Sequence, residues 1–449
     1  MRTVQKRNIL EMIHTLHQAH DEIKRNMESK QYILAQDMLS QCQECAIRIG
    51  TEIEKSEGEG FITVSHIEEY CDVLYQVHEE LNGRDSVNVN KIYKTLKKYM
   101  LKIENSVKHD ISVRKEIVFL PYKASMWDSL ESVWQAADAD QTCDAYVIPI
   151  PYYDKNPDGS FRQMHYEGDQ YPKKVPITNY KEFDFETHHP DIIYIHNPYD
   201  NINLVTSVHP FFYSDNLKKY TDKLIYIPYF VMGEVSPDNE ATVESKKHYC
   251  MTPGVLNADK VIVESEDVRQ IYIKALTKEM GAASRSKWEE KILGLGSPKF
   301  DKVINTKKED LEIPEEWLKI IQKPDGSWKK IIFYNTSIGT LLNDNEKMLE
   351  KMKQVFGIFK ENQDKVALLW RPHPLIQATV SSMRPQLWKA YEKIVEQYRS
   401  ESWGIYDDSA DMDRAVVLSD AYYGDRSSVV YLYQKTGKPV MIQDSDIVI

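Results

Sequence analysis

Two series of short apolar runs, separated by helix-like stretches, constrain the fold of this 449-residue chain most strongly. An amphipathic helix pattern, SMWDSLESVWQAA (125–137), lies between the first two runs of the first series. Near-continuous Val/Ile/Tyr runs that alternate with helices are typical of a parallel sheet covered on both faces. This predicts a Rossmann-like layer from the runs EIVFLPY (116–122), DAYVIPIPYY (144–153), DIIYIHNPYD (191–200), LIYIPYF (224–230) and KVIVES (260–265).

The second series starts near residue 329 and shows the same alternation of apolar runs and helix-like stretches. Helical patterns separate the runs KKIIFYNTS, KVALLWRPHP, WGIYDD, AYYGD and KPVMIQ. We therefore predict an α/β chain of GT-B-like architecture, with two Rossmann-like domains, 113–327 (including a connecting region) and 328–449, that face a cleft. Ligands of such sheets bind outside the carboxyl ends of the strands, which here means the interdomain cleft.

Residues 1–112 carry apolar side chains at helical spacing, as in Ile9, Met12, Ile13 and Leu16, with charges between them. EKSEGEG (54–60) and LNGRDS (81–86) interrupt the pattern. We predict an all-helical N-terminal domain that packs on the rest of the chain. Self-association through these helices and peripheral association with a membrane stay open.

Composition excludes several classes of function. The formal charge of −12 argues against nucleic-acid binding, which needs a basic face. The N-terminus lacks an apolar signal segment, so the predicted location is cytoplasmic, with attachment to the inner face of the plasma membrane left open. Five cysteines argue against a disulfide framework, and Cys42 and Cys45 fit helix-core thiols better than a zinc site.

Polar side chains follow three apolar runs of the second series. In LLWRPHPLIQ (368–377), Arg371 and His373 come directly after a strand-like run. Arginine offers a fixed fork of donors for phosphate oxygens, and histidine can donate a hydrogen bond in either charge state. An arginine that caps a helix and a histidine packed beside proline are the structural alternative.

Two further loops repeat this arrangement, and serines at a helix start are also phosphate ligands. Three such loops on adjacent strands would enclose a diphosphate, although plain N-capping by the serines is equally consistent with the pattern. No Walker or dinucleotide glycine motif and no H-E-x-x-H motif occurs, so we predict no metal site. The loop residues are Asn335, Thr336, Ser337, Asp425, Arg426, Ser427 and Ser428.

Three motifs in order resemble those of one family. GSPKFD (296–301), RPHP (371–374) and SDAYYGDRSSVVYLYQKTGKPVMI (419–442) are similar to signatures of the CDP-glycerol glycerophosphotransferases, the teichoic acid polymerases and primases. The resemblance implies a GT-B fold, CDP-glycerol as donor and transfer of glycerol phosphate to a polyol-phosphate or lipid-linked acceptor, with release of CMP. It implies no required cofactor.

The resemblance also implies roles for individual residues. His373 and Arg371 would contact the donor diphosphate, and Asp425, Ser427 and Ser428 would hold phosphate or glycerol. Two positions depart from the family pattern. Lys299 replaces an arginine, and Met232 precedes Gly233 where the family has a histidine, its expected catalytic base.

We therefore look for the base on neighbouring strand ends and predict His196, with a structural histidine as the alternative. Tyrosines at the same edge could form a groove for a polyol acceptor, or belong to core and rim. The predicted acceptor-side residues are Tyr122, Tyr153, Asp200, Tyr229 and Glu234.

Two other functions remain open from sequence. A GT-B glycosyltransferase that uses a nucleotide sugar would share the fold and the diphosphate pocket, with Glu264 or Glu266 on the ribose or sugar. A non-catalytic member that acts as an assembly scaffold would explain the missing histidine. The sequence does not distinguish glycerol from ribitol, or one addition from many.

Overall fold

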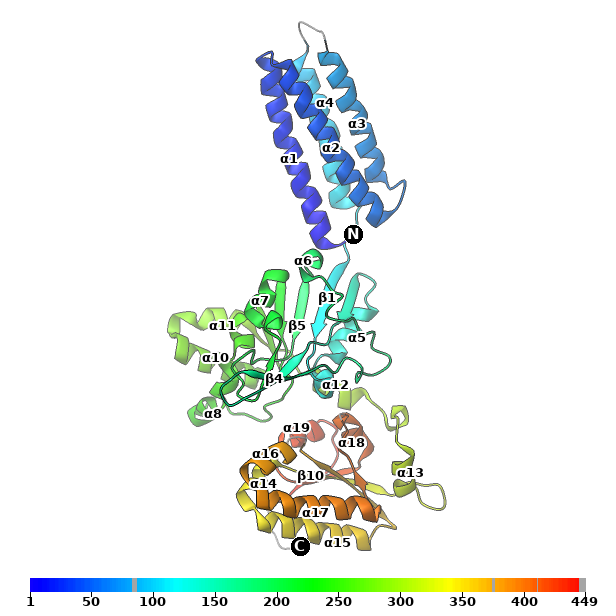
Figure 1. Cartoon of the computed structure of the whole chain (residues 1–449), viewed down its shortest axis with the longest axis vertical. Coiled ribbons are helices and arrows are strands. Elements are labelled where there is room, and N and C mark those ends of the chain that lie inside the picture. Colours follow the sequence, from blue (N-terminus) through cyan, green and yellow to red (C-terminus); the bar gives the residue numbers. More distant parts are fainter. Residues whose placement is uncertain (83–86, 374–375, 410, 444–449) are drawn as a thin grey trace.

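The computed structural model describes residues 1–82, 87–373, 376–409 and 411–443. Figure 1 shows a helical bundle, a first α/β domain and a second α/β domain, one after another along the long axis. Pro374 of the RPHP motif lies outside the described residues.

The first 109 residues form a four-helix bundle. On each helix the apolar residues recur at three- and four-residue intervals and bury one stripe, as Leu96 and Met100 do on the last helix. The predicted interruption near 54–60 is confirmed, because α2 ends at Glu57 and α3 begins at Ile62. Of the interruption predicted at 81–86, residues 83–86 lie outside the described residues. The turn at 29–31, where Lys30 has φ 57°, was not predicted. The helices are α1 (Thr3–Glu28), α2 (Tyr32–Glu57), α3 (Ile62–Leu81) and α4 (Val89–His109).

A polar pair lies inside the bundle. His20 Nε2 and the Tyr70 hydroxyl lie 2.6 Å apart, and burial lowers the pKa of His20 to about 4, so this ring is neutral at pH 7. Cys42 is buried nearby, and burial raises the pKa of its thiol to about 12. Both cysteines of the C-x-x-C pair are free thiols on α2.

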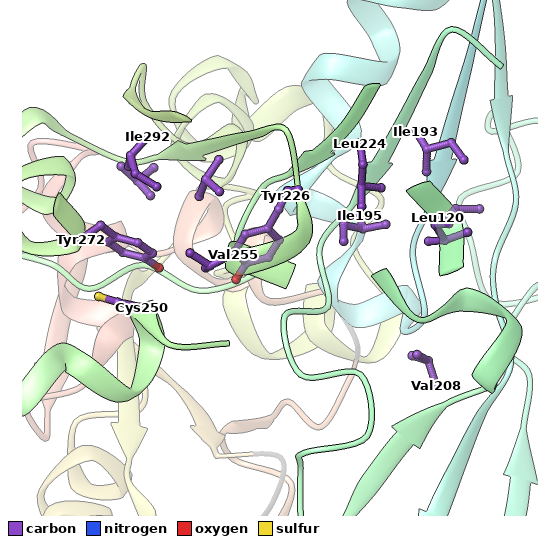
Figure 2. Packing of buried hydrophobic residues seen from close by; sticks show 14 of the residues in the cluster. Leu120, Ile193, Ile195, Val208, Leu224, Tyr226, Cys250, Val255, Tyr272 and Ile292 are labelled. Atoms are coloured by element: carbon purple, nitrogen blue, oxygen red, sulfur yellow. The ribbon is translucent and has the colours of Figure 1, made fainter. Parts of the chain in front are cut away.

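The first α/β domain is built on a six-stranded parallel sheet in the order β2-β1-β5-β7-β8-β9. Figure 2 shows its core, in which side chains of the central strands such as Leu120, Ile193 and Leu224 pack beside Tyr226. Arg7 of the bundle reaches Asp222 at 3.2 Å, just before β7, so the bundle meets the amino ends of these strands. The strands are β1 (Lys115–Leu120), β2 (Cys143–Val147), β5 (Ile192–Ile195), β7 (Lys223–Tyr226), β8 (Lys260–Val263) and β9 (Ile292–Gly294).

Short helices connect and cover these strands. Ser265 caps the longest of them, because its side-chain oxygen accepts the Val268 N–H at 3.2 Å. They are η1 (Ala124–Ser129), α5 (Glu131–Ala139), α6 (Phe185–His188), η2 (Pro210–Phe212), α7 (Ser214–Leu217), η3 (Lys218–Tyr220), α8 (Glu240–Cys250), α9 (Pro253–Asn257), α10 (Glu266–Met280), η4 (Ala282–Ser284) and α11 (Arg285–Lys291).

A small antiparallel sheet accompanies this domain and was not predicted. Its order is β4-β3-β6, from β3 (Tyr152–Lys155), β4 (Phe161–His165) and β6 (Thr206–Val208). The run at 144–153, which we treated as one strand, is divided between the two sheets. Pro149 and Pro151 separate β2 from β3, because proline has no N–H to give to a ladder.

The second α/β domain carries five parallel strands in the order β12-β11-β10-β13-β14, which confirms the predicted α/β class with two parallel sheets after a helical segment. The order reverses at β10, between β11 and β13, which is where such sheets bind ligands. The strands are β10 (Lys330–Thr336), β11 (Val366–Pro372), β12 (Ile405–Tyr406), β13 (Ala421–Gly424) and β14 (Val440–Ile442). The helices are α14 (Ile338–Asp344), α15 (Glu346–Glu361), α16 (Ile376–Met383), α17 (Pro385–Glu401), α18 (Met412–Leu418) and α19 (Ser428–Gln434).

Three short helices join the domains: α12 (Pro298–Asn305), η5 (Lys308–Asp310) and α13 (Glu315–Ile321). The limits at 112 and 327 that we predicted fall in the connections before β1 and before β10. Within the part of the chain that the structure describes, no helix has the length and apolar character needed to cross a membrane.

Truncation of Leu96 to alanine tests the bundle. Leu96 is fully buried, so we expect the free energy of unfolding to fall by about 2–5 kcal/mol, from lost burial and the cavity left behind. Leu101 on the same helix is 43% exposed, and its truncation should change stability by about 0.5 kcal/mol or less. Denaturant unfolding of the whole chain, followed by helical circular dichroism, measures both; equal losses would contradict this packing.

Candidate active site

The strand ends of β10, β11 and β13 lie at one edge of the second sheet. The ladder pairs Asn335 of β10 with Arg371 on one side and with Gly424 on the other. Gly424 has φ 142°, and a Cβ there would overlap the backbone of Asn335, so this close approach requires glycine. Three loops therefore leave the sheet side by side.

The side chain of Asn335 joins these loops. Its Nδ2 donates to the Arg371 carbonyl at 3.0 Å, and its Oδ1 accepts the Ser427 hydroxyl at 3.0 Å. The amide is buried, so we assign it to holding the loops rather than to contact with a ligand. Thr336 is buried too, and its hydroxyl accepts the Trp370 indole N–H at 3.1 Å.

Asp425 and Ser337 connect two of the loops. The Ser337 N–H donates to Asp425 Oδ2 at 2.7 Å. The Ser337 hydroxyl caps α14, because it accepts the Thr340 N–H at 3.2 Å. Asp425 is buried, so its carboxylate is enclosed by these loops.

Three side chains remain accessible at this edge. His373 and Arg426 are exposed, and Ser427 is half-buried. The His373 N–H donates to the Thr336 carbonyl at 3.1 Å, and partial desolvation lowers the pKa of its ring from 6.5. Ser428 begins α19, and its side chain lies outside what the structure describes. The edge thus presents an imidazole, a guanidinium and a hydroxyl.

The guanidinium of Arg371 bonds to groups of the protein itself. Its guanidinium is buried, with Nη1 2.5 Å from Asp407 Oδ2 and Nη2 donating to the Ser409 carbonyl at 2.7 Å. These contacts tie the end of β11 to the loop after β12. The arginine therefore supports the edge from inside, because a carboxylate of the neighbouring loop takes up its charge.

A groove adjoins His373. It encloses about 720 Å³ between the ends of β11 and β12 and helix α17. Aromatic and charged groups line it, among them Trp388, Tyr406, Glu392 and Arg399. Such a lining offers stacking faces together with groups that bind hydroxyls or amines.

On the first domain, His196 is fully buried at the end of β5. Its Nε2 accepts the Tyr122 N–H at 3.0 Å, which leaves the proton on Nδ1, 2.9 Å from the Ser129 hydroxyl. Burial lowers the pKa of His196 to about 3. Both nitrogens are engaged inside the domain, so this geometry does not favour the base role that we predicted and fits its structural alternative.

The other residues that we predicted on the acceptor side do not form a single group. The Tyr122 ring, itself buried, packs against that of Tyr229, with centroids 6.2 Å apart, whereas Tyr153 stacks on Phe161 of the small sheet at 4.7 Å. Asp200 is buried and accepts the Ser214 hydroxyl at 2.6 Å, and burial raises the pKa of Asp200 to about 6. These contacts bring Tyr122 and Tyr229 together and give Asp200 a structural partner.

The loop at 232–234 carries Met232, where the resemblance led us to expect a histidine. The N–H groups of Met232 and Gly233 each donate to one Glu264 oxygen at 2.8 Å, and burial raises the pKa of Glu264. Gly233 has φ 76°, and a Cβ there would overlap the ring of Tyr431 in the second domain. Glu234 follows and is exposed.

A buried charge cluster, which sequence reasoning missed, lies between the domains. The Lys299 ammonium pairs with Asp128, and both side chains are 9% exposed. Asp413 of α18 is buried beside them, and burial, reinforced by the charge of Asp128, raises the pKa of Asp413 well above its ordinary value. No group of three or more potential metal ligands gathers anywhere in the described residues.

The second half of the chain has a family match. The model of the family described as "CDP-Glycerol:Poly(glycerophosphate) glycerophosphotransferase" matches residues 232–448, from the Met232 loop through the whole edge described above. This segment belongs to the CDP-glycerol glycerophosphotransferase family. The resemblance that the motifs indicated is confirmed.

No curated protein matches the chain. Among solved structures, a variant of the wall teichoic acid polymerase TagF is 17% identical with a TM-score of 0.40, over 80% of this chain and 79% of that one. A UDP-N-acetylglucosamine 2-epimerase from Listeria monocytogenes is 14% identical, with a TM-score of 0.42 and coverages of 74% and 79%. Starch synthase IV from Arabidopsis thaliana is 11% identical, with a TM-score of 0.34 and coverages of 73% and 82%.

Replacement of Arg371 by methionine tests its structural role in this glycerophosphotransferase segment. The change leaves Asp407 buried without its counter-charge, and we expect a loss of about 3–5 kcal/mol in stability. Arg371→Met with Asp407→Asn should recover most of that loss. Thermal unfolding measures both variants; a single variant as stable as the wild type would show that the pair is not formed.

The pH dependence of stability tests the interdomain cluster. The raised pKa of Asp413 means that the folded state retains a proton that the unfolded state releases above its ordinary pKa of 3.8. Stability should therefore fall as pH rises through the folded-state pKa, and Asp413→Asn should remove this part of the fall.

Denaturant unfolding at a series of pH values measures the effect. Asp408→Asn is the matched control, because Asp408 is 63% exposed, and it should keep the wild-type slope. Parallel profiles for the wild type and Asp413→Asn would contradict the placement of Asp413.

Proposed function

We propose that the chain transfers glycerol phosphate from CDP-glycerol to a hydroxyl of a polyol-phosphate acceptor and releases CMP. The observation that carries the proposal is the joined edge of β10, β11 and β13, which lies within the family match and presents His373 at the sheet's reversal point. The family supplies the donor class, and the edge supplies a place for the donor's diphosphate.

The reaction is an in-line displacement at the phosphorus that carries glycerol. The acceptor oxygen forms the new P–O bond, the bridging P–O bond to CMP breaks, and the acceptor proton leaves to solvent or a base. Most of the catalysis in such a transfer is positioning and charge stabilisation. We assign this task to the His373 ring and to Arg426, with Ser427 as a further donor.

The groove beside His373 is the place that we propose for the nucleoside. Its volume of about 720 Å³ lies within the range of small-molecule sites. Trp388 and Tyr406 would offer their faces to the base, and Glu392 could accept hydrogen bonds from an amine or a ribose hydroxyl. The diphosphate would then lie across the strand ends.

We propose the exposed Glu234 and the Tyr229 rim as the acceptor side of the cleft, and His196 as support for Tyr122. A lipid-linked or polymeric acceptor both fit this assignment. We propose that the reaction takes place in the cytoplasm. Attachment to a membrane and self-association through the helical bundle are separate proposals, and the proposed reaction requires neither of them.

Replacement of His373 by alanine tests the donor site. Loss of one group that stabilises charge in the transition state should lower kcat/KM by about 10²-fold or more. The fold should persist, because the side chain is exposed. His109→Ala removes an exposed histidine of the bundle and should leave turnover unchanged. CMP release in the presence of acceptor is the assay; equal rates for both variants would remove His373 from the site.

Calorimetric titration separates the candidate functions. We expect binding of CDP-glycerol that His373→Ala weakens, with CDP alone binding through the groove. Tighter binding of CDP-ribitol than of CDP-glycerol would indicate that the donor carries ribitol. Binding of UDP-glucose without CDP-glycerol would indicate a glycosyltransferase, and absence of binding by any nucleotide would indicate a scaffold.

A further inference from the structure

Helix α15 carries a buried lysine. Lys351 lies on the apolar stripe of this helix with Met348, Met352 and Val355, and it is 3% exposed. Burial of an ammonium costs free energy unless the group is paired and hydrogen-bonded. Its position on the stripe would suit a methionine, so the charge requires an explanation.

The ammonium of Lys351 lies next to the loops at the ends of the strands that form the site. It donates to the Gln443 carbonyl at 2.5 Å and lies 3.6 Å from Asp425 Oδ1. The other carboxylate oxygen of Asp425 accepts the Ser337 N–H at 2.7 Å. One lysine thus connects the loops that follow β10, β13 and β14.

These loops are also joined through their backbones. The Asp425 N–H donates to the Asn335 carbonyl at 3.1 Å, and the Gln443 N–H donates to the Gly424 carbonyl at 3.0 Å. These bonds hold the Asp425 carboxylate beside the Lys351 ammonium. Within the described residues, Asp425 Oδ1 has no hydrogen-bond partner, so the attraction of Lys351 is its main compensation.

Lys351 favours the ionised form of Asp425, together with the Ser337 N–H. Burial raises the pKa of Asp425, while the Ser337 N–H and the charge of Lys351 lower it. The other titratable groups that face Asp425 are phenols, of Tyr334 on β10, Tyr391 on α17 and Tyr422 on β13, and burial raises the pKa of each. Lys351 is the charged group in this surrounding, as far as the structure describes it.

We propose that Lys351 is a positioning residue for the donor diphosphate, which keeps Asp425 ionised and thereby holds the loops at 335–337 and 425–427 in their binding arrangement. This inference rests on the proposed function. Stability alone does not explain the pair, because a buried ion pair is often no more stable than an apolar replacement of similar volume.

Lys351→Met tests the proposal, with Lys353→Met, an exposed lysine of the same helix, as the matched control. At neutral pH, Lys351→Met should raise the KM for CDP-glycerol about tenfold, as expected for loss of one charge-assisted hydrogen bond, and change kcat less. Without the ammonium the pKa of Asp425 rises. The KM should therefore recover as pH increases and the carboxylate ionises again, a pH dependence that the wild type and Lys353→Met lack.

A second readout needs no donor. Hydrogen exchange of the Ser337 amide should be faster in Lys351→Met than in Lys353→Met, because the acceptor of that N–H weakens. If CDP-glycerol is not the donor, the kinetic arm fails while the exchange difference persists. Equal exchange in the two variants would overturn the role of Lys351 whatever the donor is.

The double variant Lys351→Met with Asp425→Asn covers the case in which the single variant does not fold. It removes both charges and keeps an acceptor for the Ser337 N–H, so it should be as stable as the wild type. Its KM should be raised equally at all pH values. A wild-type KM in this variant would show that the buried charges do not position the donor.

Discussion

The amide of Asn335 is the contact on which the site depends. It bonds to both neighbouring loops, to one through its nitrogen and to the other through its oxygen. A carboxylate could not donate and a hydroxyl could not reach both sides, so the geometry suits an amide. Parallel pairing places the ends of the three strands side by side. The two hydrogen bonds of this amide then fix the distances between the loops that follow them.

The sequence predicted the larger organisation well. Val- and Ile-rich runs report burial on both faces directly, so both parallel sheets and the helical segment could be anticipated. The small sheet could not, because its strands are short and its first strand continues an apolar run. Only the absence of an N–H at Pro149 and Pro151 marks the division, and a proline is compatible with several local structures.

The site was predicted less completely. The position of a polar side chain in the sequence of a strand does not show which group of the folded protein it will bond to. Arg371 lies near the end of β11, yet its guanidinium pairs with Asp407 on the next loop. His196 lies at a strand end as expected, yet a backbone N–H occupies its basic nitrogen. Lys351 did leave a signal, because a lysine on the apolar stripe of a helix indicates a buried partner.

The contact between Gly233 and the Tyr431 ring bears on how closely the two domains approach each other. Glu264 accepts the N–H groups of the Gly233 loop and belongs to the same domain, so these hydrogen bonds do not involve the second domain. The ring presses on a backbone that carries no side chain, and such a surface has no directional bond to break. A side chain at position 233 would overlap the Tyr431 ring, so its absence sets how near this loop of the first domain can come to α19 of the second.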